Sequence, residues 1–341
     1  MDFSSDTSAP AHPAVLQAIA GVNHGYAPSY GADSSTETLT ALLANKLGTE
    51  DFDVWLTASG TAANALALAA ICPPTASILC HEEAHIERDE RGAPEFFSGG
   101  AKLALLPGEN GQIDREQLRR AMGAIDRSFV HETPPTVLSL TNLTECGTAY
   151  STDRIGEYAD LAHENGLTVH LDGARLANAL VSQRATLADM TWRAGVDVLT
   201  LGLTKTGAMG CELIVLFGAQ RSRFGDLRAR AKRAGHMPPK LRYLAAQGIA
   251  LFQDDLWLEL AAQANCFAQQ LAETLCAAGG ATLAYPVDGN EVFVHLPKTV
   301  VGRLRDAGAK FYPWPGGSHR FVCSWATMED DIGSVRAVLS S

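Results

Sequence analysis

The sequence predicts an α/β protein with a mostly parallel sheet, followed by a smaller α+β domain. Between residues 53 and 217, short apolar runs of strand length alternate with stretches of helical spacing. Such alternation is typical of a parallel sheet that helices cover on both faces. The alternation ends near residue 220, where longer helical segments and then short mixed elements follow. We therefore expect a large domain over residues 1–250 and a small domain over residues 251–341.

The elements of the large domain can be assigned in chain order. Residues 13–25 and 35–48 show helical spacing after a polar N-terminal arm. A strand over 53–58 runs into an alanine-rich helix over 59–72. The other predicted strands are 77–81, 102–107, 136–142, 168–172, 196–202 and 213–217, and helices are expected over 115–125, 154–166 and 187–195.

The remainder of the chain has a different character. Residues 221–247 are basic and helical in spacing, and residues 254–280 form a long amphipathic helix that glycines end. The last part mixes short strands and helices over 281–297, 300–314 and 319–325. This pattern predicts the small α+β domain.

Composition excludes several classes of function. The chain is 46% hydrophobic and 19% charged, as ordinary globular proteins are. Its net charge of -11 argues against nucleic acid or an anionic membrane as a partner. The seven cysteines are odd in number and form no CxxC pair, so we expect neither a disulfide framework nor a metal site. The segment MDFSSDTSAPAHP lacks the features of a signal peptide, and no apolar stretch is long enough to span a bilayer, so we expect a cytoplasmic protein.

Lys205 lies in the segment LTLGLTKTGAMGCE (199–212), where an apolar run stops among small residues. A phosphate-binding P-loop needs glycines before its lysine, whereas Leu203 and Thr204 precede Lys205 and the glycines follow it. The dinucleotide fingerprint is missing too, because no G-x-G-x-x-G opens a helix after an early strand. Lys205 is therefore either an ordinary surface lysine or a lysine held in a pocket for covalent chemistry.

Polar groups follow three of the predicted strands. Ser59, Gly60 and Thr61 stand where a strand gives way to a helix, and they form either an anion site at the helix N-terminus or a simple N-cap. Asp172 ends another strand, either as an acid that faces a ligand or as part of an Asp-Gly turn. Lys205 follows the next strand. Because ligands bind at the carboxyl ends of parallel strands, the three features together predict one cofactor site.

These residues resemble the fold-type I pyridoxal 5′-phosphate (PLP) enzymes, and more closely the low-specificity L-threonine aldolases. The resemblance covers nearly the whole chain, most clearly the large domain, and it implies the aspartate aminotransferase fold with a PLP-binding large domain. The matching segments occur in the family's order. They are FSSDT (3–7), SYGAD (29–33), AHIERDERGAPEFFSGGAK (84–102), LTNLTECGTAYS (140–151), HLDGARLANAL (170–180), TKTGAMGCE (204–212) and KRAGHMPPKLRYLAAQ (232–247).

The resemblance implies a role for each residue of the expected cofactor site. Lys205 matches the lysine that forms a Schiff base with PLP, and a lysine buried among apolar groups becomes a usable nucleophile. Asp172 matches the acid that pairs with the pyridinium nitrogen and keeps the ring an electron sink. Ser59, Gly60 and Thr61 match the phosphate cup.

His85 matches the imidazole that stacks on the PLP ring, although on its own CHEEAHIERDE also fits a solvated acidic loop. Arg175 and Arg320, with Ser5 beside them, match the groups near the substrate carboxylate. An arginine fork binds a carboxylate through two hydrogen bonds. For Arg320 a surface salt bridge is the alternative.

Tyr30 and Arg242 match positions that a neighbouring subunit contributes, Tyr30 to the substrate and Arg242 to the cofactor. Arg175 is expected near the cofactor as well as the substrate. The GHMPPK stretch before Arg242 departs from the glycine-rich run of other family branches. Active sites between subunits imply a homodimer or homotetramer.

One departure from the family concerns the base that removes the β-hydroxyl proton. Many members carry a histidine just after the strand that matches TVLSLTN, near the substrate's β-hydroxyl. Here the stretch offers Asn142, Thr144 and Glu145 instead. His85 or a phosphate-linked water could serve, whereas His131 lies before the strand.

The resemblance implies a reversible aldolase that converts L-threonine, L-allo-threonine or a related β-hydroxy-α-amino acid such as phenylserine to glycine and an aldehyde. A different PLP-dependent β-eliminating lyase or an aminotransferase on this fold is the nearest alternative. A nicotinamide-dependent oxidoreductase is more distant because the glycine fingerprint is missing. A non-catalytic binding protein would have no need of Lys205 and Asp172.

Overall fold

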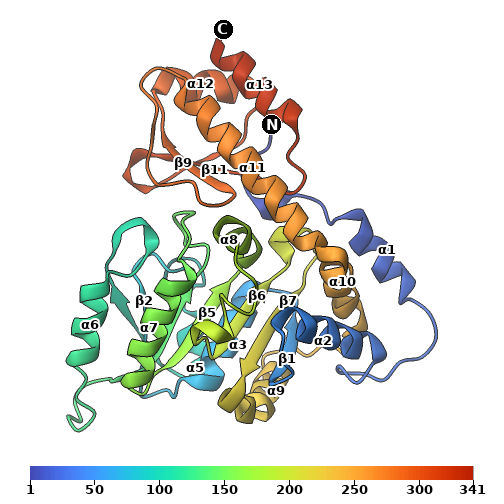
Figure 1. Cartoon of the computed structure of the whole chain (residues 1–341), viewed down its shortest axis with the longest axis vertical. Coiled ribbons are helices and arrows are strands. Elements are labelled where there is room, and N and C mark those ends of the chain that lie inside the picture. The colour runs from blue at the N-terminus through green and yellow to red at the C-terminus, as the bar shows by residue number, and fades with distance from the viewer. Residues whose placement is uncertain (341) are drawn as a thin grey trace.

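The computed structural model describes residues 1–340 as a large α/β part with a smaller part above it (Figure 1). The large part contains a seven-stranded sheet with the order β1-β7-β6-β5-β4-β2-β3. The strands are β1 (Phe52–Thr57), β2 (Ser77–His81), β3 (Lys102–Leu106), β4 (Pro135–Thr141), β5 (Thr168–Gly173), β6 (Val198–Gly202) and β7 (Glu212–Phe217).

The sheet is mostly parallel, as the alternating pattern predicts. β7 runs antiparallel to both of its neighbours, β1 and β6, and the remaining neighbours pair in parallel. Every residue of β2, β6 and β7 is buried. This burial explains their mostly apolar sequences, because helices cover both faces of the sheet. In Figure 1, α7 (Thr152–Glu164) lies in front of the strands and α3 (Gly60–Ile71) behind them.

Most expected helices are present. α1 (Pro13–Gly21) and α2 (Ser34–Leu47) follow the N-terminal arm, and α6 (Arg115–Gly123) precedes β4. Asp33 caps α2 by accepting a hydrogen bond from the Thr36 amide at 2.9 Å. The short helices α4 (His85–Arg88), α5 (Ala93–Ser98) and α8 (Leu176–Gln183) complete the large part.

Two helix predictions need correction. The segment 187–195 contains only a 3₁₀ turn, Trp192–Ala194, because the Thr191 backbone leaves the helical region at φ -122° and ψ -108°. The basic segment 221–247 divides into α9 (Phe224–Arg233) and α10 (Arg242–Phe252). Gly235 at φ 78° and two consecutive prolines separate them, and proline disfavours helical geometry in the residue before it.

The smaller part is built on a four-stranded antiparallel sheet with the order β10-β11-β9-β8. The long helix α11 (Leu256–Cys276) packs against it, together with α12 (Lys298–Asp306) and α13 (Glu329–Ser340), the last of which the sequence patterns did not predict. The strands are β8 (Thr282–Leu283), β9 (Glu291–His295), β10 (Tyr312–Pro313) and β11 (His319–Val322).

Residues 1–340 form two hydrophobic cores, and helix α11 contributes side chains to both. Trp257 and Leu260 of α11 pack in the core of the large part, whereas Leu271 and Leu275 of the same helix pack in the smaller core. Phe3, from the N-terminal arm, also packs in the smaller core. The division into 1–250 and 251–341 stays a prediction.

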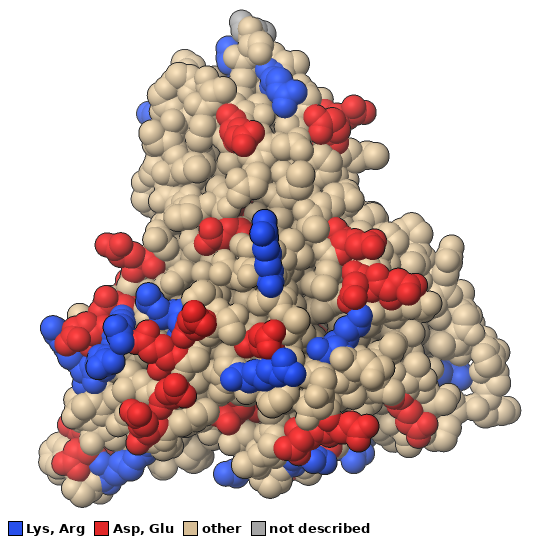
Figure 2. Space-filling model, in the orientation of Figure 1, with Lys and Arg blue, Asp and Glu red and all other residues tan. Residues whose placement is uncertain are grey.

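Charged side chains are interspersed over the face shown in Figure 2, with no extended patch of one sign over the large part. No helix within residues 1–340 is both long enough and apolar enough to cross a bilayer.

Candidate active site

The expected site residues follow strands whose carboxyl ends meet at one edge of the sheet. Asp172 is the next-to-last residue of β5, and Lys205 lies in a 3₁₀ turn directly after β6. Ser59 is the N-cap of α3, which follows β1, and His85 begins α4, which follows β2. β1, β2, β5 and β6 all run in the same direction, so their loops gather where open α/β sheets bind ligands.

A cavity of about 250 Å³ lies at this edge. It brings together six of the eleven predicted site residues: Ser59, Gly60, Thr61, His85, Asp172 and Lys205. Its other lining residues are Thr7, Ala58, Asn64, Ala174, Thr204 and Glu212. A larger cavity of about 680 Å³ elsewhere contains none of the eleven.

The N-terminus of α3 opens into this cavity. Ser59 caps the helix, because its Oγ accepts a hydrogen bond from the Ala62 amide at 3.5 Å. The first amides of a helix have no partner within the helix, and the helix dipole makes this end positive. Since Gly60 and Thr61 line the cavity, the cap and an anion site are compatible here.

Asp172 is buried and held by two hydrogen bonds. Its Oδ1 accepts from the Ala174 amide at 3.0 Å, and its Oδ2 accepts from Asn64 Nδ2 at 2.7 Å. The Asp-Gly pair is no flexible turn, because Gly173 belongs to β5 and a Cβ there would lie 2.8 Å from the Thr200 carbonyl oxygen. Close packing of β5 on β6 therefore requires this glycine and fixes the direction of the carboxylate.

Lys205 differs from the lysine expected among apolar groups. Its side chain is partly exposed. The charge of Arg175 and, after it, that of Lys205 outweigh burial and lower the pKa of Asp6. The Thr204 hydrogen bond and the Lys205 charge also act to lower the pKa of Glu212, but they do not outweigh burial. Burial dominates for Glu212 and raises its pKa to about 7. Within residues 1–340, the Lys205 amine forms no hydrogen bond and no ion pair. The pocket thus offers an uncommitted amine in acidic surroundings.

His85 lies in the cavity wall and not in a solvated loop. Its Nδ1 forms a hydrogen bond with Glu90 Oε1 at 2.8 Å, and the same oxygen accepts from Asn64 Nδ2 at 2.9 Å. Burial alone would lower the pKa of His85, but the Glu90 hydrogen bond and the Asp172 charge raise it above its ordinary value. His85 and Asp172 are therefore linked through Asn64 and Glu90.

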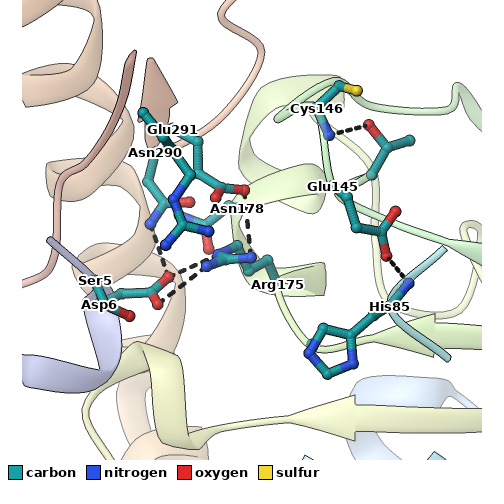
Figure 3. A network of polar contacts seen from close by, with 12 residues as sticks. Ser5, Asp6, His85, Glu145, Cys146, Arg175, Asn178, Asn290 and Glu291 are labelled. Carbon is teal, nitrogen blue, oxygen red and sulfur yellow. Dashed lines mark hydrogen bonds and ion pairs between the residues drawn. The ribbon is translucent and has the colours of Figure 1, made fainter. Parts of the chain in front are cut away.

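Glu145 supports His85 from the other side. Its Oε1 accepts a hydrogen bond from the His85 amide at 2.6 Å, as Figure 3 shows. The second oxygen, Oε2, is buried and has no hydrogen-bond partner. Burial and the nearby Asp172 charge raise the pKa of Glu145 to about 7.

This carboxyl group makes stability depend on pH. Between its ordinary value of 4.5 and about 7, the folded protein keeps a proton on Glu145 that the unfolded chain has lost, so stability falls as pH rises through this window. Glu145→Gln keeps the acceptor for the His85 amide and removes the charge. We expect the melting temperature of Glu145→Gln, relative to wild type, to rise by roughly 2 °C or more between pH 5 and pH 8. Calorimetry at both pH values measures this, and an equal difference at both would contradict it.

Arg175 is close to the cavity but does not line it. Its Nε and Nη2 donate hydrogen bonds to Asp6 at 2.7 and 3.1 Å, and its Nη1 lies 3.3 Å from Glu291 Oε2 (Figure 3). Burial alone would lower the pKa of Arg175, but the two carboxylates raise it. The expected carboxylate-binding arginine is thus already paired with protein carboxylates.

Arg320 extends from the small sheet and has no carboxylate partner within residues 1–340, so the alternative of a surface salt bridge is not seen. Its Nη2 donates to the Ser4 carbonyl at 3.3 Å, its guanidinium lies 5.0 Å from the Trp314 ring centre, and its Nε is buried without a partner. Ser5 lies in the adjoining turn, where its Oγ is 2.8 Å from Thr7 Oγ1.

Tyr30 and Arg242 lie outside the cavity. Tyr30 is exposed, with Lys232 Nζ 4.8 Å from its ring centre. Arg242 begins α10 and donates to the carbonyl oxygens of His24 and Gly25 at 3.1 and 3.3 Å. The single chain does not bring these two residues to the cavity.

Sequence patterns missed several polar groups that shape the site. Asn64, Glu90 and Glu212 are buried, and each contacts a predicted site residue or lines the cavity. A lone asparagine in the alanine- and leucine-rich stretch 60–71 was the one available signal, because a polar side chain in an apolar helix needs a partner.

A family model for beta-eliminating lyases matches residues 2–299. The chain belongs to the beta-eliminating lyase family. This family member is 40% identical to the low specificity L-threonine aldolase of Pseudomonas aeruginosa over 335 residues, which are 98% of the chain and 94% of that relative. Family and relative together support a PLP-dependent lyase, as the resemblance implies.

Solved structures agree with the fold of the chain. A threonine aldolase from Leishmania major has a TM-score of 0.91 at 29% identity, with 99% of this chain and 98% of that one covered. An aspartate aminotransferase from Rhodobacter sphaeroides shares the fold, with a TM-score of 0.71 at 20% identity and coverage of 100% and 92%. The predicted fold class is confirmed.

Proposed function

We propose that this family member is a PLP-dependent aldolase that cleaves L-threonine, L-allo-threonine or related β-hydroxy-α-amino acids such as phenylserine to glycine and an aldehyde, reversibly. The observation that carries the proposal is one cavity that holds the Lys205 amine, the Asp172 carboxylate and the N-terminus of α3. The names of the curated relative and of the Leishmania structure support the choice of substrate.

The groups around the cavity fit PLP. The amine of Lys205 has no partner in the described chain, as a lysine that must bond to an aldehyde requires. Ser59, Gly60 and Thr61 offer the positive end of α3 to a phosphate. Asp172 is buried and already oriented by two hydrogen bonds, so it can hold a protonated ring nitrogen. His85 can cover the ring.

PLP, when bound, supplies an electron sink for the pair released as the Cα–Cβ bond breaks. The chain's own groups would do the rest. The negative charge of Asp172 would keep the ring nitrogen of PLP protonated, and a hydrogen bond from Asn64 holds the Asp172 carboxylate in place. Arg320 and Arg175 would bind the substrate carboxylate and so orient the substrate. This orientation determines which bond at Cα is placed for cleavage.

The proton of the β-hydroxyl needs a base, and His85 is the best candidate. Thr144 Oγ1 is buried and bonded within its own loop, 2.9 Å from Thr148 Oγ1, and Asn142 Nδ2 donates to the Tyr150 carbonyl. His131 is exposed in a loop and stacks on Phe129. His85 alone of these groups lines the cavity.

Arg320 provides a test of carboxylate binding. We expect Arg320→Ala to lower kcat/KM for L-threonine by about 10- to 100-fold, mostly through KM, because hydrogen bonds to charged groups contribute about 1.5–3 kcal/mol. Arg320→Lys keeps the charge but loses the fork, so it should recover only part of the loss. Steady-state kinetics measures this, and an unchanged KM in Arg320→Ala would give Arg320 a purely structural role.

We also infer a homodimer or homotetramer in the cytoplasm, with the active site completed between subunits. Tyr30 and Arg242 lie outside the cavity of their own chain, which supports a contribution from a neighbour. Light scattering on the purified protein would give the number of subunits.

The experiment that tests the function is a product assay. PLP-loaded protein is incubated with L-threonine, and acetaldehyde, glycine, ammonia and 2-oxobutyrate are measured together. Equal amounts of acetaldehyde and glycine would support the aldolase. Ammonia with the 2-oxo acid would indicate a β-eliminating lyase instead, and transfer of the amino group to an added 2-oxo acid would indicate an aminotransferase. Failure to take up PLP would exclude all three.

A further inference from the structure

Arg175 is held by carboxylates from both parts of the molecule. Asp6 comes from the N-terminal arm, and Glu291 is the first residue of β9 in the small sheet. Both carboxylates are buried, at 1% side-chain exposure each. Figure 3 shows the Arg175 guanidinium between them. A buried arginine needs one negative partner, so the second carboxylate is not required to neutralise it.

The two carboxylates bind Arg175 in different ways. Asp6 accepts two hydrogen bonds from it, and Asn290 Nδ2 donates a third to Asp6 at 3.1 Å. Glu291 Oε2 lies 3.3 Å from Arg175 Nη1, yet it is buried and accepts no hydrogen bond. Nη1 in turn donates no hydrogen bond within residues 1–340. Asp6 therefore orients Arg175, whereas Glu291 supplies charge at the end of the guanidinium that still has hydrogens to donate.

The small sheet places Glu291 and Arg320 on one face. Successive side chains of a strand alternate between faces, and Val292, Val294 and Phe321 face the small core. Arg320 pairs with Phe293 and Val322 pairs with Glu291 in the register of β11 and β9, so Arg320 and Glu291 share the opposite face. This face carries both the Arg320 guanidinium, which has no carboxylate partner within residues 1–340, and the carboxylate that reaches Arg175.

Glu291 has little freedom to turn away. Gly147 packs directly on it, since a Cβ at Gly147 would lie 3.1 Å from Glu291 Cβ. The preceding residue is fixed too, because Asn290 Nδ2 donates to the Cys323 carbonyl at 2.8 Å and to Asp6. These contacts hold the base of the Glu291 side chain beside Arg175.

We propose that Glu291 competes with the amino-acid carboxylate for the Nη1 end of Arg175, and thereby weakens amino-acid binding and promotes the release of glycine. The inference rests on the proposed function, in which Arg175 and Arg320 bind that carboxylate. With substrate bound, three carboxylates face two guanidinium groups, and Glu291 is the one that makes no hydrogen bond. Glycine keeps its carboxylate after cleavage, so the same competition acts on the product.

The test measures glycine binding to the PLP-loaded protein by titration calorimetry, with KM for L-threonine as a second readout. We expect Glu291→Gln to lower the dissociation constant of glycine about tenfold, equivalent to about 1.4 kcal/mol, and to lower KM in parallel. Glu291→Ala should act in the same direction. Asp6→Asn should raise the dissociation constant about tenfold, because it removes the group that orients Arg175.

Asp288→Asn is the matched control. Asp288 lies three residues before Glu291 and accepts a hydrogen bond from the Ala149 amide at 3.0 Å, but it does not contact Arg175. The Asp288→Asn variant should bind glycine with the same affinity as wild type. An unchanged or higher dissociation constant in Glu291→Gln and Glu291→Ala would overturn the inference while wild type still cleaves threonine. A wild type that neither binds glycine nor cleaves threonine would overturn the proposed function as well.

Discussion

Lys205→Ala should reduce the release of acetaldehyde from L-threonine by at least about a thousandfold, which corresponds to about 4 kcal/mol in the barrier. Lys205 is the lysine of the cavity, and its amine is free of other partners in the described chain. Without it, the chain cannot hold PLP covalently, and the visible absorption of the bound cofactor should be lost or altered. Activity and the absorption spectrum are measured on the same sample, before and after borohydride.

Two variants separate covalent chemistry from charge. Lys205→Arg keeps the positive charge, but its guanidinium stays protonated and cannot act as the nucleophile, so it should be as inactive as Lys205→Ala. Lys102→Ala removes an exposed lysine at the start of β3 and should behave as wild type. A Lys205→Ala protein that is still yellow and active would contradict a covalent role for Lys205 and indicate an ordinary surface lysine.

Asp172→Asn should lower kcat by about 100- to 1,000-fold, because it removes a negative charge that a buried site cannot replace with water. The fold should survive, since an amide oxygen can still accept from the Ala174 amide. PLP should still attach to Lys205, so the spectrum keeps its cofactor band while turnover falls. The Asp172 variant should therefore keep its cofactor and lose turnover, whereas the Lys205 variant should lose both the covalently held cofactor and turnover.

Asp197→Asn is the control for loss of a strand-end carboxylate. Asp197 precedes β6 at the opposite edge of the sheet, where it accepts hydrogen bonds from the Val169 amide and from His163 Nε2. Its removal can affect stability but should leave kcat unchanged. Equal loss of kcat in both variants would mean that Asp172 acts through the fold rather than at the cofactor.

The sequence predicts those parts of the site that depend on strand order alone. Asp172 stands at the end of β5 and Lys205 follows β6, the next strand, so a parallel sheet must bring them together once the strands are recognised. The N-terminus of α3 is predicted in the same way, because Ser59, Gly60 and Thr61 directly follow a predicted strand. The family resemblance was needed for His85, because a histidine in an acidic stretch has no strand pattern to position it.

Long-range contacts are the part that sequence patterns cannot supply. Asp6 and Glu291 meet at Arg175 from opposite ends of the chain, and no local period relates them. The sequence next to Lys205 consists of small and uncharged residues, so it gives no sign of Asp6, whose carboxylate lies close enough in space for the Lys205 charge to lower its pKa. Two consecutive prolines between α9 and α10 indicate a break. The helical spacing on both sides of the prolines nevertheless led to the prediction of one helical segment.

The packing of the N-terminal arm against the small sheet joins segments that are synthesised far apart in time. The Phe3 amide donates to the Lys310 carbonyl at 2.9 Å, and the Val322 amide donates to the Phe3 carbonyl at 2.9 Å. These partners are separated by about 300 residues of chain, so their pairing carries one of the largest loop-closure costs in the molecule. During synthesis β5, which bears Asp172, and the turn that bears Lys205 are complete well before β11 exists. The corner around Arg175 combines Asp6 of the arm with Glu291 of β9, so we expect it to be complete only after the small sheet has been synthesised and has paired with Phe3.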